Sequence, residues 1–337
     1  MQPPLRPEDR RALAAWLLVN VALVFAMVVV GGVTRLTHSG LSIAEWQPLV
    51  GALPPLSEAD WQALFARYRE TPEFRLVNFA MDLEGFKRIF WWEYVHRLLG
   101  RLIGLAYLLP FLWFLARRRI PAPLAWKLWG IFALGALQGA MGWYMVESGL
   151  VDNPRVSHFR LTAHLGLALA ILGAELWLAL GLLRGAPRAR APGAALAAVV
   201  AALVFLMALS GGFVAGLRAG YAYNTFPLMN GHLVPPETLM LEPWWRNFLY
   251  NIAAVQLVHR GFFWLLAVLV PLLWWRARRA AAAPAPGLLL AAFGLQAALG
   301  IATLLHAVPV PLAAAHQGGA VLVLGAALWT AHALRGT

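Results

Sequence analysis

The sequence predicts an all-α polytopic membrane protein with eight transmembrane helices, arranged as two tandem pseudo-symmetric four-helix bundles. Three observations predict this fold. Hydrophobic residues make up 61% of the 337-residue chain and charged residues only 12%, which is more apolar surface than a soluble domain of this size buries. Eight apolar runs reach the length needed to cross a bilayer. Motifs in the first four runs recur, in the same order, in the last four.

The eight predicted spans each hold about 20 or more mostly apolar residues, enough for a bilayer core of roughly 30 Å. A segment in lipid must satisfy its own backbone hydrogen bonds, so each span is expected to be helical. The spans are 12–31, 89–115, 126–146, 158–183, 194–217, 248–275, 287–307 and 312–334. In the first outer loop, the amphipathic stretch SEADWQALFARYRE (57–70) is expected to lie along the membrane surface. The third outer loop, 218–247, is expected to form an ordered cap.

The distribution of basic residues predicts the orientation. With both termini on one side, that side and its loops 116–127, 184–192 and 276–286 carry fourteen lysines and arginines against two acidic residues. The opposite loops hold ten basic and eleven acidic residues. Excess lysine and arginine marks the cytoplasmic side of a membrane. Both termini are therefore expected on the cytoplasmic side, and the membrane is expected to be a bacterial inner membrane. This asymmetry explains the net charge of +12 without any nucleic-acid partner.

The chain contains no cysteine. Disulfides, thiolate metal sites and covalent c-type haem attachment are therefore excluded. The first apolar run lacks a small-residue cleavage site and is too long for a signal peptide, so it is expected to stay in the protein as an anchor. Metal or haem chemistry in this chain must depend on other ligands, of which histidine is the first candidate.

Two halves, 1–185 and 186–337, are predicted from the repeat. EYVHR in the second span matches QLVHR in the sixth, and RLTAHLGLAL in the fourth matches PLAAAHQGGA in the eighth. LQGAMGWYMV matches LQAALGIATL, and the exits GGVTRL and GGFVAGLR also correspond. Because each half has an even number of spans, both halves insert with the same orientation.

Four of the nine histidines occupy repeated positions at similar depth in the even-numbered spans. They are His96, His164, His259 and His316. Within a half the two histidine-bearing helices run parallel, so their imidazoles are expected to face each other, an arrangement suited to the axial ligands of haem iron. For each histidine taken singly, a hydrogen-bonded core residue is the alternative. Zinc or copper sites usually need more ligands than a pair supplies.

Glycines follow His96 on the same helical face, at Gly100 and Gly104. They predict either a flat wall for a porphyrin or a small-xxx-small helix contact, and the sequence does not separate the two. The remaining histidines have no repeat partner and are expected in loops or at helix ends. These are His38, His158, His232, His306 and His332.

The residue three before the first histidine differs between the halves. It is Glu93 in the first and Gln256 in the second. A buried carboxylate one turn from an iron ligand can exchange protons with a reacting group, and glutamine cannot. The first half is therefore predicted to be the chemical site, although a Glu93–Arg97 pair that only neutralises charge is the alternative. Glu175, in the fourth span, is a second intramembrane acid whose role the sequence leaves open.

Two arginines stand at equivalent helix exits, Arg35 in the first half and Arg218 in the second. A guanidinium binds carboxylates through paired hydrogen bonds, so these arginines are candidates to anchor haem propionates. Side chains that only extend to the membrane interface are the alternative.

With these residues the chain resembles the haem A synthase family, in its cysteine-free mitochondrial and alphaproteobacterial type. The resemblance runs in order along nearly the whole chain, through GGVTRLTHSGLSIAEWQPLVGALPP, FKRIFWWEYVHRLLGRLIGL, GAMGWYMVESGLV, AGLRAGYAYNTFPLMNG and AAAHQ. It implies an oxidoreductase that converts the C8 methyl of haem O to the formyl of haem A for terminal oxidases, through an alcohol and a hydrated aldehyde.

The resemblance also implies roles for single residues. His96 and His164 would hold the substrate haem O, and His259 and His316 a resident haem b. Glu93 matches the family's essential glutamate. A haem O synthase is the expected partner for substrate delivery, and a homo-oligomer is compatible with the sequence. The electron acceptor, the source of the inserted oxygen and the oligomeric state are left open.

Two other functions share the histidine pattern. A non-catalytic dihaem membrane cytochrome would need the four histidines but gives no reason for Glu93, and a haem transporter or assembly factor would bind haem unchanged. Substitution of Glu93 by glutamine separates the first from a synthase, and pigment extraction separates the second.

Overall fold

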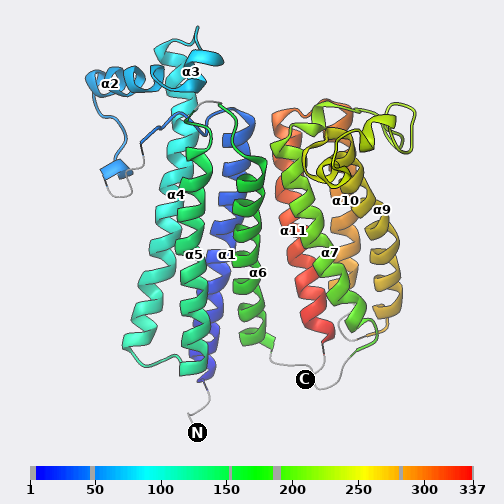
Figure 1. Cartoon of the computed structure of the whole chain (residues 1–337). Coiled ribbons are helices and arrows are strands. Elements are labelled where there is room, and N and C mark those ends of the chain that lie inside the picture. Colours follow the sequence, from blue (N-terminus) through cyan, green and yellow to red (C-terminus); the bar gives the residue numbers. More distant parts are fainter. Residues whose placement is uncertain (1–4, 46–49, 152–153, 185–190, 281–283, 336–337) are drawn as a thin grey trace.

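The computed structural model describes residues 5–45, 50–151, 154–184, 191–280 and 284–335, and these residues fold into helices and connecting loops (Figure 1). The described residues contain no β-strand, and only Met229 and His232 form an isolated bridge. The long helices are α1 (Pro7–Leu36), α4 (Leu83–Ala116), α5 (Ala122–Glu147), α6 (His158–Arg184), α7 (Ala194–Gly216), α9 (Ile252–Ala277), α10 (Pro284–Leu305) and α11 (Val310–Leu334). The shorter elements are α2 (Glu58–Arg69), α3 (Pro72–Leu76), α8 (Asn247–Tyr250) and the 3₁₀ turns η1 (Val50–Ala52), η2 (Ala219–Tyr221), η3 (Pro236–Leu239) and η4 (Trp244–Arg246).

Seven helices in the described part of the chain are long and apolar enough to cross a membrane. They are α1, α4, α6, α7, α9, α10 and α11. The predicted third span is α5, a helix of 26 residues that does not belong to this set. Its outer half carries Gln138, Trp143 and Tyr144 between glycines, which lowers its apolar character. The chain is a multi-pass membrane protein by the length and composition of these helices.

The predicted start of the sixth span, residue 248, is wrong. The chain breaks at Asn251, where the short α8 ends and α9 begins. Asn251 has an extended backbone, and its Oδ1 accepts hydrogen bonds from the backbone nitrogens of Ala253 and Ala254 at 2.9 and 3.4 Å. An asparagine in this position satisfies the first free N–H groups of a helix, so α9 begins at Ile252, four residues after the predicted start of the span.

The long helices pack as neighbours in two groups of four (Figure 1). In the first, α1 contacts α4 and α6, and α5 contacts α4 and α6. In the second, α7 contacts α9 and α11, and α10 contacts α9 and α11. Contacts of α6 with α7 and of α1 with α11 join the groups. The proposed boundary between the halves, 185/186, lies outside the described residues, as do parts of the predicted loops 184–192 and 276–286.

A buried apolar core runs along the helices, whereas many large apolar side chains on their outer faces are exposed. Leu105 and Leu109 of α4 are 51% and 60% exposed, and Val268 of α9 is 66% exposed. Such exposure would be costly in water and is what a lipid-facing surface requires. The start of α1 and the end of α11 lie at the same end of the helices (Figure 1), as the predicted topology requires.

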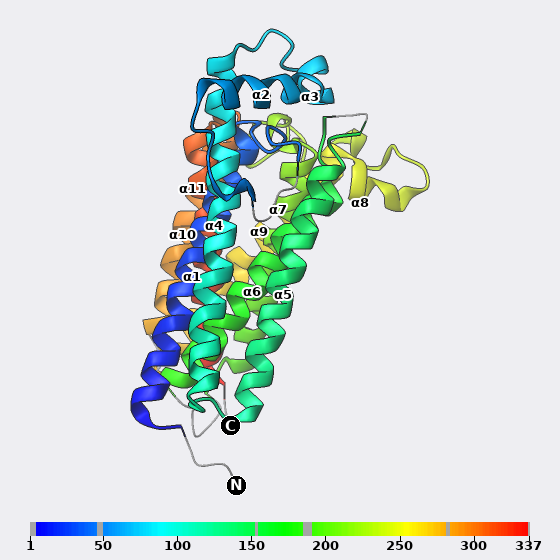
Figure 2. The same cartoon turned by 90° about the vertical axis from the view of Figure 1, so that its left-hand side faces the viewer.

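The long first outer loop forms a cap over α4, in which α2 and α3 lie across the end of the helices (Figure 2). The predicted helix at 57–70 is confirmed as α2. Ser57 begins it with a reciprocal capping box, since its Oγ accepts from Asp60 N at 3.1 Å and Asp60 Oδ2 accepts from Ser57 N at 3.0 Å. The cap is held by an aromatic cluster in which Tyr68 stacks on Phe86 at 5.1 Å between ring centroids.

Candidate functional site

Each of the four repeated histidines lies against a glycine of a neighbouring helix. The pairs are Gly31 and His96, Gly142 and His164, Gly211 and His259, and Gly300 and His316. A Cβ atom placed on these glycines would lie 2.9, 3.0, 3.3 and 2.7 Å from the respective imidazole. Because glycine has no side chain, each of these four glycines leaves space for the imidazole ring of its histidine. Sequence analysis missed this role, although Gly142 and Gly300 stand out in the repeat.

Electrostatic interactions link the histidines across neighbouring helices, whereas the facing of each pair toward one haem stays a prediction. His96 of α4 lies within electrostatic range of His164 of α6, and His259 of α9 within range of His316 of α11. All four side chains are half-buried although they lie well inside long helices. Among the described residues, no group of three histidine, cysteine, aspartate or glutamate side chains converges to hold a metal ion. The donor sets are pairs of imidazoles.

Polar neighbours fix the orientation of the rings. Ser210 Oγ donates to Met207 O at 2.7 Å and lies 2.8 Å from His259 Nδ1, so it accepts the Nδ1 proton. This tautomer leaves the lone pair of His259 Nε2 free, which is the form of histidine that binds iron. In the repeat, Ser210 corresponds to Val30 of the first half, which offers no such contact.

The repeated glutamines also contact histidines. Gln138 Nε2 lies 3.3 Å from His164 Nε2, and Gln296 Nε2 lies 3.0 Å from His316 Nδ1. The other ring nitrogen of His164, Nδ1, is buried without a hydrogen-bond partner. A buried imidazole with one nitrogen held and the other unpaired fits a site completed by a bound group.

Open space borders part of α4 near His96. A Cβ atom on Gly104 would have no atom within 4 Å outside its own helix, whereas one on Gly100 would lie 3.4 Å from Met27 Cε. Gly104 therefore makes no close helix contact, and the small-xxx-small alternative does not apply at that position. A flat wall for a porphyrin remains the prediction for this face of α4.

Glu93 is buried, with 3% of its side chain exposed, and is bound by the first outer loop and Arg97. Ser42 Oγ and Ile43 N donate to its Oε2 at 2.7 and 2.8 Å. Arg97 Nε and Nη2 donate to its Oε1 at 3.0 and 2.5 Å. Arg97 also donates to the carbonyls of Ile43 and Glu45 at 2.6 and 2.9 Å. Glu93 and Arg97 thus hydrogen-bond the first outer loop to α4, one helical turn from His96.

The second half repeats this arrangement without the carboxylate. Arg260 Nη2 donates to Gln256 Oε1 at 2.9 Å, four residues apart as in Glu93–Arg97. Gln256 Nε2 donates to Ala219 O and Ala222 O at 2.8 and 2.7 Å, so it also binds its outer loop. In both halves these hydrogen bonds hold an outer loop against a histidine-bearing helix. The difference between the halves is the ionisable group itself.

Arg35 and Arg218 lie close to one another where the two helix groups meet, and each binds the opposite half. Arg35 Nη2 donates to Ala215 O of α7, and Arg218 Nη2 donates to His38 Nδ1 at 3.2 Å. Burial and the two guanidinium groups lower the pKa of His38, which keeps its imidazole neutral and able to accept. These contacts join the outer ends of α1 and α7. Propionate binding by the two arginines stays a prediction.

The other ionisable residues of interest lie apart from the histidine pairs. His158 begins α6, His306 follows α10, His232 is in the third outer loop, and His332 is in the last turn of α11. Glu175 of α6 is 1% exposed and its Oε2 has no hydrogen-bond partner. By the repeat its counterpart is Ala327. These positions agree with the predicted loop and helix-end histidines.

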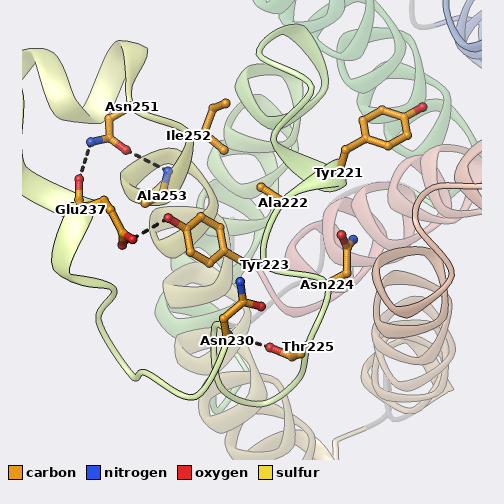
Figure 3. Close-up of a pocket in the computed structure, with 10 residues that line it drawn as sticks. All are labelled: Tyr221, Ala222, Tyr223, Asn224, Thr225, Asn230, Glu237, Asn251, Ile252 and Ala253. Carbon is orange, nitrogen blue, oxygen red and sulfur yellow. Dashed lines mark hydrogen bonds between the residues drawn. The ribbon is translucent and has the colours of Figure 1, made fainter.

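Two cavities lie on the outer side. One, of about 620 Å³, is lined by the third outer loop and the start of α9, including Tyr223, Glu237 and Asn251 (Figure 3). The other, of about 60 Å³, lies beside the Glu93 loop and is lined by Ser42 and Tyr68 among others. Neither is lined by one of the four repeated histidines.

These features define a class of protein, a multi-pass helical membrane protein with two pairs of imidazoles held between its helices. Its family follows from comparison. Residues 14–328 match the model of the family described as cytochrome oxidase assembly protein, and the chain belongs to this family.

Curated relatives extend over almost the whole chain. The chain is 58% identical over 345 residues to the heme A synthase of Nitrosospira multiformis, covering 97% of this chain and 94% of that protein. It is 53% identical to the heme A synthase of Nitrosomonas eutropha, covering 97% and 95%. It is 51% identical to that of Parvibaculum lavamentivorans, again covering 97% and 95%.

Proposed function

We propose that this chain is a haem A synthase, an oxidoreductase that converts haem O to haem A by oxidising the C8 methyl group to a formyl group. The observation that carries the proposal is the identity of 51–58% with proteins of that name over nearly their full length. The half-buried imidazoles of the four repeated histidines support it, because two such imidazoles are the donor set that six-coordinate haem iron takes from a helical protein.

We further propose an eight-span topology in which α5 is the third span. At 26 residues, α5 is about 39 Å long, enough to cross, and it packs between α4 and α6, which both have spanning character. The chain then forms two pseudo-symmetric four-helix halves, 1–185 and 186–337. Both termini lie in the cytoplasm and the histidines near the outer side of the inner membrane, as the distribution of basic residues favours.

His96 and His164 hold the substrate haem O in this proposal, and His259 and His316 hold a resident haem b. The contacts of the two pairs favour this division. Ser210 fixes the tautomer of His259, as expected for a permanently bound group, whereas His96 has Val30 at the equivalent place. A site that must release its product benefits from a less rigidly held ligand. Haem b, when bound, supplies one-electron redox chemistry.

Glu93 is the proposed catalytic base, because oxidation of a methyl group to a formyl group requires removal of protons from the substrate carbon and its hydroxyl. Arg97 and the loop at Ser42 hold the carboxylate in place. Gln256 keeps equivalent contacts in the second half but does not accept a proton. The loss of the acid there fits an electron-transfer site. Arg35 and Arg218 are proposed to bind propionates at the outer rim.

Purification from cells that make haem O, followed by chromatography of the extracted haems, tests the function. We expect haem A from the wild type, and haem O or an intermediate from Glu93→Gln. Glu84→Gln is the matched control, since Glu84 is an exposed glutamate in the first turn of the same helix. A wild-type protein that yields no formyl haem contradicts the function. A Glu93→Gln protein that makes haem A normally shows that another group acts as the base.

The half assignments are tested by two further variants. We expect His259→Ala to lose haem b, and His96→Ala to keep haem b and lose turnover. The reverse result would exchange the roles of the halves. Delivery by a haem O synthase is also proposed, and crosslinking in membranes that never recovers such an enzyme speaks against direct transfer.

A further inference from the structure

A buried acid, Glu73, lies in the outer cap near Glu93. Glu73 is 5% exposed and Tyr68 is 1% exposed. The Tyr68 hydroxyl donates to Glu73 Oε2 at 3.2 Å and accepts from Asn78 Nδ2 at 2.7 Å. The Tyr68 ring is fixed by its stacking on Phe86. The cap thus holds a phenol and a carboxyl in direct contact, and Arg67, Arg97 and Arg101 line the small cavity beside Tyr68.

The titratable groups that face Glu73 are Tyr68 of α2 and Glu93 of α4. Burial raises the pKa of Glu73 to about 7, and the negative charge of Glu93 adds to this effect. Burial raises the pKa of the Tyr68 hydroxyl, and the charge of Glu93 also acts on this hydroxyl and helps to raise its pKa. A carboxyl group with a pKa near the working pH both accepts and releases protons readily.

A cavity of about 60 Å³ lies beside both Tyr68 and the residues that bind the Glu93 carboxylate; Glu73 and Glu93 themselves do not line it. Tyr68 lines it, and so do Ser42, Ile43 and Arg97, the three residues that bind the Glu93 carboxylate. A cavity of this size is large enough to hold water. Its walls offer a hydroxyl, a phenol and a guanidinium as hydrogen-bond partners. Water there would bridge the Glu93 environment and the Tyr68 oxygen.

We propose that Tyr68 and Glu73, with water in this cavity, carry protons from Glu93 to the outer aqueous phase. The inference rests on the proposed function, in which Glu93 takes protons from the substrate. A protonated Glu93 passes its proton to Ser42 Oγ, which shares a 2.7 Å hydrogen bond with Glu93 Oε2, as the Ser42 proton moves to a cavity water. That water passes a proton to the Tyr68 oxygen while the Tyr68 proton moves to Glu73 Oε2. Glu73 then releases its proton outside. No electron moves, and the Glu93 carboxylate is restored.

The second half offers a contrast. Tyr223 also donates to a glutamate, Glu237 Oε2, at 3.3 Å, but Glu237 is exposed, Tyr223 is only half-buried, and both border the wide outer cavity (Figure 3). The residue at the Glu93 position is Gln256, which has no proton to pass on. A buried acid pair joined to an intramembrane acid therefore occurs in the half proposed to carry the chemistry.

The test follows haem A formation against external pH in spheroplasts that contain haem O, whose outer face is open to the buffer. We expect wild-type turnover to rise between about pH 6 and pH 8, as Glu73 loses its proton and becomes able to accept another. Glu73→Gln should slow turnover at least about tenfold and remove this pH step. Glu70→Gln, an exposed glutamate at the end of α2, is the matched control and should behave as the wild type.

Tyr68→Phe keeps the ring packing and removes only the hydroxyl. We expect it to slow turnover and to raise the solvent deuterium isotope effect, with haem content unchanged. If Glu73→Gln or Tyr68→Phe turns over as the wild type, the relay is refuted. If Glu73→Gln is slow but keeps the wild-type pH step, Glu73 is only structural and the relay is also refuted. If Glu73→Gln does not fold, Tyr68→Phe decides alone. A wild type that makes no haem A refutes the proposed function instead.

Discussion

Replacement of Gly300 by alanine tests the contact between glycine and histidine most directly. The added Cβ would lie 2.7 Å from His316 Cε1 and 3.2 Å from His316 Nδ1. Ordinary contact begins at 3.4 Å, so the imidazole must move by about 0.7 Å or the helices must separate. A metal ligand tolerates displacement of only about 0.5 Å before the site is impaired. We therefore expect Gly300→Ala to weaken binding of the resident haem.

The magnitude follows from the cost of overpacking, about 1–3 kcal/mol. At about 1.4 kcal/mol per tenfold, haem affinity should fall about 5- to 150-fold. Gly294→Ala is the matched control on the same helix, since its Cβ would have no atom within 4 Å outside its own helix. Both variants gain similar helix propensity, about 1 kcal/mol, so the difference between them isolates the imidazole contact.

The assay is haem b per protein after purification, together with the low-spin spectrum of a bis-histidine haem. Titration with a soluble competitor for haem gives the relative affinities. We expect Gly294→Ala to match the wild type and Gly300→Ala to lose haem b. If Gly300→Ala keeps the haem and its spectrum unchanged, the glycine does not shape the ligand site and the proposed role of His316 is refuted.

Three further outcomes are expected. Ser210→Ala should lower haem b affinity about 10- to 100-fold, because the tautomer of His259 is no longer fixed; unchanged haem content would contradict this. Ser42→Ala should cost roughly 1.5–3 kcal/mol in the placement of Glu93, measured as slower haem A formation with normal haem content, whereas full activity would show that Ser42 is dispensable. For the cap, the pKa of Glu73 is raised to about 7, so the folded cap keeps a proton that the unfolded segment loses above about pH 4.5. The free energy of unfolding of the cap should thus be greatest below about pH 4.5, fall by roughly 3 kcal/mol as the pH rises to 7, and change no further above pH 7. The rate of proteolysis within α2 and α3, compared between the wild type and Glu73→Gln at each pH, measures this change. Equal pH dependence in the two proteins would refute the prediction.

The sequence predicted the helices well because span length and apolar composition are local properties of the chain. All the predicted spans coincide largely with long helices, and α2 lies where its capping serine and periodic apolar residues place it. The start of α9 was missed, because the apolar run continues through Asn251 whereas the asparagine caps a new helix there. The spanning character of α5 also could not be settled by composition, because its glycines and polar residues weaken the apolar signal.

The repeat predicts which histidines act together as ligands, because equal spacing in two halves places equivalent residues at equal depth, and this pairing stays a prediction. It did not predict the glycine behind each imidazole, the serine that fixes His259, or the crossing of Arg35 and Arg218 between the halves. Each of these contacts joins residues on different helices. Their distances depend on how the helices pack, which the spacing within one helix does not specify.

By itself the sequence determined the membrane class, the two-fold repeat, the four histidines and the replacement of a glutamate by a glutamine between the halves. Only the tertiary structure decided that Glu93 is bound by Ser42, Ile43 and Arg97, and that a second buried acid, Glu73, lies near it in the cap. The physical reason is that a carboxyl group's neighbours come from loops and helices distant in the chain, and these neighbours set its charge and its hydrogen bonds.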